Sequence, residues 1–398
     1  MKAFTEPLLS LAGFEEMTKT AEKSSGLISV TGCIDAQKSQ MIYAFGGHRK
    51  NKLIVTFGEQ KAKELYDEYS FFDKEVVYYP SKDVLFYQSD IRGNLLTAER
   101  IRALKAIREQ ERVTLVTTFD ALMNTMAPIE KMWENVLTLE QGQLLDLKEI
   151  QAALIRMGYE KEYQVQTMGQ FSVRGGILDV FPLTEENPIR IELWGDEIDT
   201  IRYFDCESQK SIENIDRVSI YPAAELVLSD EEKAGGIEKL KAEAKRVSDK
   251  LRKQMKTEEA HRVTVMADEL TEEWGELSMY AGMDAFLSYF FDERVGLLDY
   301  FKPSDSLIFF DELTRCTEQG KLTETEFSES MKQRLAMGYI LPGQMNGLFT
   351  EKEIVAKLEK YSCIALGALD NKANGLHQLG SRCHRAYPLS LAVDDQLE

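Results

Sequence analysis

Short apolar runs rich in β-branched residues alternate with helical patterns along the first third of the chain. These runs lie at 27–32, 52–57, 75–80 and 112–118, with amphipathic segments between them at 59–69 and 97–110. Continuous apolar strands that alternate with helices are typical of a parallel sheet covered by helices. The first third is therefore predicted to be an α/β unit built on a parallel sheet.

The pattern changes after the fourth run. Residues 146–158 form one amphipathic helical pattern, with Asp146 and Glu149 as a predicted capping box and Gly158 as its stop. Strands of period two then follow in the segments EYQVQT, QFSVRGG, ILDVFP, PIRIELWGDEIDTIRYF and DRVSIYP. Turn residues lie close together between them, which predicts hairpins and an antiparallel sheet.

Beyond this meander, α/β character returns after a polar stretch. Residues 226–261 are dense in Glu and Lys and predict one or two solvated helices. SLIFFDE (306–312) and CIALGAL (363–369) predict further buried strands. A meander between two α/β segments suggests an insertion, so the expected domains are 130–222 and a discontinuous outer domain of 1–129 with 223–398.

Composition narrows the classes of function. The chain has 48 Lys and Arg against 67 Asp and Glu, a formal charge of −19. This balance disfavours a free-standing nucleic-acid binder, which sets Lys and Arg against phosphates, but it does not exclude a local basic patch. No stretch approaches ~20 uninterrupted apolar residues, so no membrane span is expected. Five scattered cysteines suit a reducing compartment, and a cytoplasmic location is expected.

A damaged phosphate-binding motif follows the first predicted strand. A phosphate loop needs G-x-x-x-x-G-K-[ST], in which backbone N–H groups cradle phosphates while Lys neutralises charge and the hydroxyl holds magnesium. Gly32, Lys38 and Ser39 are in frame, but Gln37 replaces the second glycine and Asp35 adds negative charge. An ordinary strand-to-helix turn is therefore the preferred interpretation of this segment.

An acidic pair, Asp311 and Glu312, ends a predicted buried strand, where an Asp holds magnesium in such enzymes. The segment LLDYFKPSDSLIFFDE (297–312) resembles the part of the helicase-like excision-repair protein UvrB that carries its acidic magnesium motif. FSVRGGILDVFP (171–182) and the PIRIELWGDEIDTIRYFDCESQKS that follows resemble the inserted domain of that protein. With the damaged phosphate loop, this combination resembles the amino-terminal module of bacterial transcription-repair coupling factors.

The resemblance implies a degenerate P-loop NTPase (RecA/helicase-like) parallel sheet domain with an inserted, mainly antiparallel α+β domain. It implies a non-catalytic module without a cofactor that recruits UvrA, the damage-recognition component of the excinuclease, in nucleotide excision repair. RNA polymerase and DNA would be bound only through regions absent from this chain. Leu313 and Thr314, which follow the acidic pair, depart from the helicase motif and agree with lost nucleotide chemistry. The alternative is an ATP-dependent helicase-like protein of the UvrB type that retains nucleotide binding.

Strand alternation singles out an interaction face on the insertion. In PIRIELWG, Arg190, Glu192 and Trp194 share the face opposite to the apolar residues, and Arg174 points away from the core in QFSVR. An aromatic beside arginines is the composition of a binding hot spot. By the resemblance, Arg174, Arg190 and Trp194 fall where residues that bind UvrA are expected, although the family more often has Phe at the third position.

A purely structural alternative exists for the same residues. Trp194 would then pack against the helix at 146–158, and the arginines would pair with Glu192 and Asp196. A metal site is not expected anywhere, because His377, Cys383 and His384 lack the second ligand pair that zinc needs.

Overall fold

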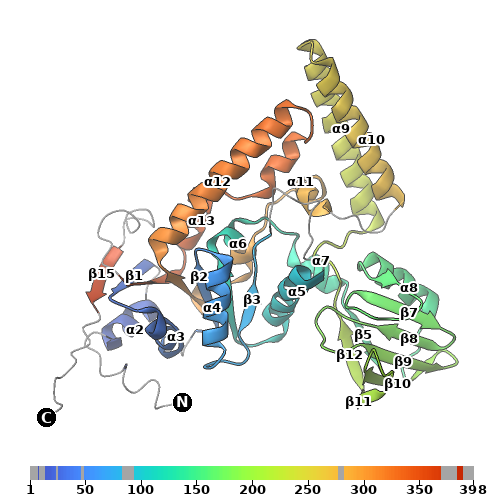
Figure 1. Cartoon of the computed structure of the whole chain (residues 1–398), viewed down its shortest axis with the longest axis horizontal. Coiled ribbons are helices and arrows are strands. Elements are labelled where there is room, and N and C mark those ends of the chain that lie inside the picture. The colour runs from blue at the N-terminus through green and yellow to red at the C-terminus, as the bar shows by residue number, and fades with distance from the viewer. Residues whose placement is uncertain are drawn as a thin grey trace.

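The computed structural model describes residues 8, 14–23, 26–45, 49–82, 94–276, 282–368 and 383–388. Within these residues the chain forms a large sheet with helices on both sides, a smaller sheet and a long helical hairpin (Figure 1). No helix in the described part of the chain is both long enough and apolar enough to cross a membrane.

The large sheet has seven strands in the order β15-β1-β14-β13-β2-β4-β3. All of its strand pairs are parallel, which confirms the parallel sheet predicted from the sequence. The strands are β1 (Gly26–Thr31), β2 (Asn51–Thr56), β3 (Val77–Tyr79), β4 (Val113–Thr118), β13 (Ser306–Asp311), β14 (Ser362–Gly367) and β15 (Cys383–Pro388).

Helices cover both faces of this sheet, as the apolar runs require. Phe310 of β13 lies in one apolar cluster and its neighbour Phe309 lies in another, on the opposite face. The Phe309 face is covered by α2 (Phe14–Lys23), α3 (Asp35–Ala44) and α4 (Glu59–Tyr69). The Phe310 face is covered by α5 (Asn94–Glu109), α6 (Phe119–Met123), α7 (Ile129–Glu134), α12 (Leu313–Ala336) and α13 (Glu351–Leu358).

The smaller sheet has six strands in the order β11-β10-β9-β8-β7-β6. They are β6 (Glu160–Lys161), β7 (Gln170–Arg174), β8 (Ile177–Val180), β9 (Ile189–Trp194), β10 (Glu197–Phe204) and β11 (Ser211–Ile215). Its pairs are antiparallel, as predicted, except that β6 runs parallel to β7. β5 (Leu137–Glu140) and β12 (Arg217–Ile220) form a separate antiparallel pair beside it.

One helix, α8 (Leu147–Arg156), closes the core of the smaller sheet by burying Leu154 among the apolar residues of β7, β8 and β9. The Asp146 carboxylate accepts from the backbone N–H groups of Lys148 and Glu149, so it caps the helix. The reciprocal bond of the predicted capping box, from the Asp146 backbone to the Glu149 side chain, is not formed. Gly158 takes a φ of +89°, in which a side chain would be strained, and this ends the helix.

The strand predicted at EYQVQT was wrong. The short β6 lies just before this segment, and the Gln170 side chain accepts from the backbone N–H groups of Gln166 and Thr167. Ser172 donates to the carbonyl of Tyr163 in the same segment. Local side-chain bonds therefore take backbone groups that a strand would use in its ladder.

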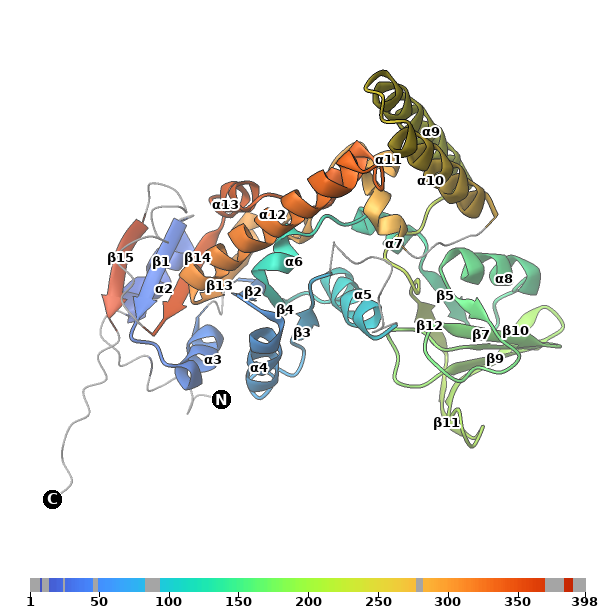
Figure 2. The same ribbon diagram turned by 45° about the horizontal axis from the view of Figure 1, so that its top comes forward.

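The polar stretch after residue 226 forms α9 (Asp230–Lys253) and α10 (Thr257–Glu276), an antiparallel hairpin that projects from the body in both views (Figures 1 and 2). The prediction of one or two helices in residues 226–261 is confirmed, although α10 continues well beyond this stretch. The seam between the two helices is buried and contains Leu240 and Val263. The base of the hairpin packs on α11 (Leu287–Phe290), where Phe290 lies directly against Gly236.

A buried ionic cluster fixes the chain where it returns from the smaller sheet. Arg100 on α5 is fully buried and donates to Glu225 through Nε at 2.7 Å and Nη2 at 3.0 Å. Lys82 Nζ lies 2.8 Å from the same carboxylate. Burial disfavours the charged form of Glu225, but the two cations outweigh it and lower its pKa to about 2.

Candidate functional site

The predicted interaction face lies on the side of the smaller sheet opposite to its apolar core. Strand register places Asp179 of β8 directly opposite Arg190 of β9, and Arg190 opposite Arg202 of β10. In the next row, Glu192 lies between Ile177 and Thr200. The face is therefore a polar layer that crosses three neighbouring strands.

Asp179 is the centre of this layer. Its side chain is only 2% exposed, and it accepts from Arg190 through Nε at 2.7 Å and Nη2 at 2.9 Å. Arg174 donates to the same carboxylate at 2.8 Å. The bidentate bond fixes the plane of the Arg190 guanidinium, which also stacks 4.3 Å over the ring of Phe204. Its hydrogen bond to Asp179 raises the pKa of Arg190, which stays charged.

The arginine pairing expected in the structural alternative was wrong. Glu192 accepts from Arg202 at 2.9 Å and from Thr200 at 3.2 Å, because Thr200 is its cross-strand neighbour. The bond to Arg202 lowers the pKa of Glu192. Asp196 is exposed in the turn between β9 and β10. Asp179, which the sequence reasoning missed, is the partner of both arginines.

Trp194 ends β9 beside this layer and is 84% exposed. It therefore does not pack against α8, contrary to the structural alternative. An indole this exposed costs free energy in water and is available to a partner. Trp194 also borders an open groove of about 620 Å³ whose wall includes Glu197 and Arg217.

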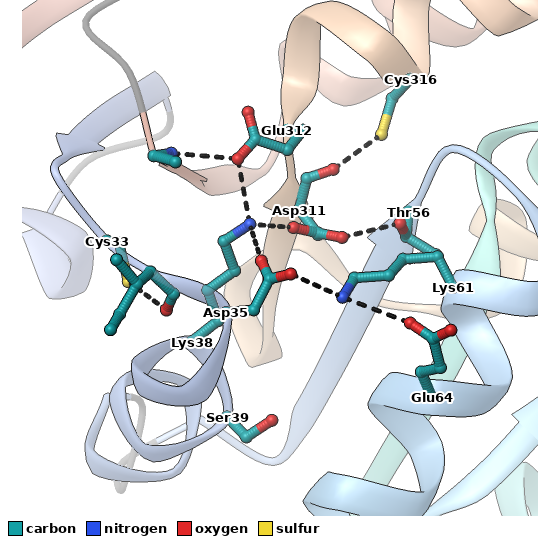
Figure 3. Close-up of polar contacts among 12 residues, drawn as sticks. Cys33, Asp35, Lys38, Ser39, Thr56, Lys61, Glu64, Asp311, Glu312 and Cys316 are labelled. Carbon is teal, nitrogen blue, oxygen red and sulfur yellow. Dashed lines mark hydrogen bonds and ion pairs between the residues drawn. The ribbon is translucent and has the colours of Figure 1, made fainter.

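Residues of the damaged phosphate-binding motif meet the acidic pair at the carboxyl ends of β1 and β13 (Figure 3). Lys38 on α3 is 1% exposed, and its Nζ lies 2.5 Å from Asp311, 2.9 Å from Asp35 and 3.0 Å from Glu312. Burial disfavours the ammonium, but these three carboxylates outweigh it and raise the pKa of Lys38. The lysine is a cation already neutralised within the protein.

The carboxylates around Lys38 have further partners of their own. Thr56 donates to Asp311 at 2.9 Å, and the backbone N–H of Ala368 donates to Glu312 at 3.0 Å. Lys61 lies 3.0 Å from Asp35. The sequence interpretation found no credible site between these motif residues, but the structure brings Lys38, Asp311 and Glu312 into direct contact.

The other motif residues do not complete a phosphate cradle. Gly32 has a φ of +79°, which suits the turn, but the next N–H, that of Cys33, donates to the carbonyl of Gly367 at 3.0 Å. Ser39 points away from the acidic pair (Figure 3). Its hydroxyl donates to Glu68 on α4 at 3.3 Å. Gln37, which replaces the loop glycine, keeps a buried side-chain oxygen without a hydrogen-bond partner.

No group of three or more potential metal ligands occurs among the described residues. His377, one of the residues considered for zinc, lies outside the described residues. Cys383 and His384 lie in β15, of which only the backbone is described. The candidate sites are therefore the polar layer around Asp179 with Trp194, and the cluster around Lys38.

Comparison with known proteins matches the smaller sheet to a family of interaction domains. Residues 137–226 match the model of the UvrB interaction domain, and this match contains Arg174, Arg190 and Trp194. The part of the chain that contains the smaller sheet is thus similar to the interaction domain of UvrB.

Most of the chain is similar to transcription-repair-coupling factors. It is 29% identical to that of Bacillus subtilis (strain 168) over 309 residues, which cover 77% of this chain and 26% of the relative. It is 28% identical to that of Staphylococcus haemolyticus (strain JCSC1435) over 327 residues, which cover 80% of this chain and 27% of the relative. The chain spans about a quarter of the length of the curated relatives it matches. The resemblance to the amino-terminal module of transcription-repair-coupling factors is thereby confirmed.

Proposed function

We propose that this chain is an interaction module that binds UvrA and recruits it in transcription-coupled nucleotide excision repair. The observation that carries the proposal is the coincidence of the UvrB interaction domain match with an exposed tryptophan beside two fixed arginines. Such a surface combines apolar area with directional charge, which is what binding hot spots use.

The geometry supports a specific mode of binding. Asp179 and Gln209 take Nε and Nη2 of Arg190, whereas its Nη1 has no partner within the described residues. A carboxylate on the partner would accept from this free edge and from Arg174, while Trp194 enters an apolar pocket. Because Asp179 already holds both guanidinium groups, their side-chain entropy is lost on folding and not on binding.

The larger unit supports a non-catalytic role, because three carboxylates already neutralise Lys38 of the damaged phosphate-binding motif. In the large sheet, the helix that carries Lys38 follows β1, and the acidic pair lies at the carboxyl end of β13. Strand β14 lies between β1 and β13. That order is compatible with a degenerate P-loop NTPase domain, which is part of the proposal. The division into 1–129 with 223–398 and 130–222 and the cytoplasmic location remain predictions of the same account.

The experiment is a pull-down of purified UvrA by the wild type and by Arg190→Glu. The Arg190 side chain is 12% exposed, and its replacement by Glu places a like charge against Asp179. We therefore expect capture of UvrA to be lost. Arg156→Glu, on an exposed position of α8, makes the same change of net charge and is the control. Equal capture by the wild type and a folded Arg190→Glu variant would refute the proposal.

The second candidate, a helicase-like protein that retains nucleotide binding, has one favouring observation: Lys38 and Asp311 are adjacent. Titration of a fluorescent ATP analogue in the presence of magnesium distinguishes this candidate from the non-catalytic module. We expect no saturable binding, because three carboxylates hold Lys38 and the Cys33 N–H is already bonded. Saturable, magnesium-dependent binding that Lys38→Ala abolishes would favour the enzyme.

A further inference from the structure

The free end of the α9–α10 hairpin concentrates positive charge in an otherwise acidic chain. Residues 241–256 hold seven basic and two acidic residues, a net of +5, whereas the whole chain carries −19. All seven basic side chains are exposed: Lys241, Lys245, Arg246, Lys250, Arg252, Lys253 and Lys256. The rest of the chain therefore carries −19 − 5 = −24.

These cations are not used inside the protein. None of the seven forms an ion pair or hydrogen bond through its side chain within the described part of the chain. Of the two acids, Glu243 is occupied by Tyr289 and by the N–H of Gly343, which leaves Asp249 as the one exposed acid of the stretch. Ala244, Ser248 and Leu251 face the seam with α10, so the six cations on α9 occupy its outward half.

The shape of this surface suits a long polyanion. Lys241 and Lys253 are twelve residues apart on one helix, about 18 Å at 1.5 Å per residue. Lys256 and Met255 continue the surface over the turn, where Met255 is 86% exposed. Both views place this turn at the free end of the hairpin, away from the two sheets (Figures 1 and 2).

We propose that this basic tip, residues 241–256, binds the phosphates of duplex DNA without sequence preference. Five of its seven cations are lysines, which are depleted in protein interfaces but act as point charges toward phosphates. The stretch has no aromatic residue on which the bases of a single strand could stack. The choice of DNA over RNA rests on the proposed repair function.

The acidic remainder gives the contact its selectivity. With −24 elsewhere, the rest of the surface repels a phosphate backbone, so duplex DNA would be held at the tip alone. If about four phosphates are neutralised, the affinity falls with a log–log salt slope of about −3.6, or roughly 150-fold between 50 and 200 mM salt.

The test is fluorescence anisotropy of a labelled 30-base-pair DNA duplex titrated with the full chain at several salt concentrations. We expect Lys250→Glu/Lys253→Glu to lower the affinity roughly tenfold or more and to reduce the salt slope by about 2. Lys148→Glu/Arg156→Glu, on exposed positions of α8, makes the same change of net charge and should leave binding intact. Thermal melting checks that each variant is folded, and UvrA capture should be unaffected by the tip variant.

Several results would overturn the proposal. These are absence of salt-dependent DNA binding by the wild type, equal loss in the tip and control variants, and tighter binding of an RNA duplex or a single strand. Binding of polyglutamate in place of the DNA duplex would assign the tip to an acidic protein surface. Failure of UvrA capture by the wild type would refute the proposed function and leave the DNA result standing.

Discussion

Asp179→Asn is the most informative single substitution in the interaction domain. The side chain is nearly isosteric, but both oxygens of Asp179 accept from arginine N–H groups. An amide offers one oxygen, so its NH₂ would face a guanidinium donor and one group would lose its bond. Because Asp179 is 2% exposed, it cannot contribute much direct contact to a partner.

The size of the effect follows from the three bonds. Bonds to charged groups contribute about 1.5–3 kcal/mol each, but Arg174 and Arg190 are partly exposed and regain water when released. We therefore expect Asp179→Asn to lower the free energy of unfolding by about 1–3 kcal/mol. In the variant, both arginines must be ordered on binding, which costs about 0.5–1.5 kcal/mol of binding free energy for each side chain. The sum of about 1–3 kcal/mol corresponds to roughly a 5- to 150-fold rise in the Kd for UvrA.

The assay is biolayer interferometry with immobilised chain and purified UvrA, alongside urea denaturation of each variant. Asp249→Asn is the control, because it removes the same charge from an exposed position of α9. A folded Asp179→Asn variant that binds UvrA with the Kd of the wild type would refute the argument that this carboxylate prepares the arginines.

The remaining predictions concern the body of the molecule. Arg100→Met leaves Glu225 without its main counter-ion and should lower the free energy of unfolding, measured with urea, by about 3–5 kcal/mol. The depressed pKa of Glu225 stabilises the fold fully above its unfolded pKa of 4.5, and this contribution is lost as the pH falls through about 2. The stability gap between the wild type and Glu225→Gln should therefore close from pH 4.5 to 2, and a constant gap would contradict this. Gly236→Ala would place a Cβ 2.2 Å from Phe290 and should destabilise the hairpin base by about 1–3 kcal/mol, whereas Gly235→Ala has open space and should be neutral or stabilising in thermal melts.

Elements with a strong local pattern were predictable from the sequence. The helix at 59–69 matches α4, and the apolar runs at 27–32 and 112–118 match β1 and β4 to within a residue. The secondary structure of these segments is specified locally, by the spacing of apolar residues and by the turn residues at their ends. EYQVQT failed because its period-two pattern is outweighed by local hydrogen bonds from the backbone N–H groups of Gln166 and Thr167 to the Gln170 side chain, which alternation does not reveal.

The candidate sites were predictable only in part. Alternation put Arg190 and Trp194 on the outer face, but identifying Asp179 as the partner required the register between β8 and β9. Asp179 does lie on the same face by alternation, and that was the available signal. The contact between Lys38 and Asp311 joins residues 273 positions apart, so it depends on the strand order of the large sheet.

The proposed role of the exposed indole of the interaction domain is to anchor UvrA. The most direct test compares the Kd of Trp194→Ala with that of Phe71→Ala, since Phe71 is 81% exposed and lies on the larger unit. A hot-spot aromatic contributes about 2 kcal/mol or more. Trp194→Ala should therefore raise the Kd at least roughly 30-fold, with Phe71→Ala within about twofold of the wild type. An unchanged Kd for a folded Trp194→Ala variant would contradict the claim.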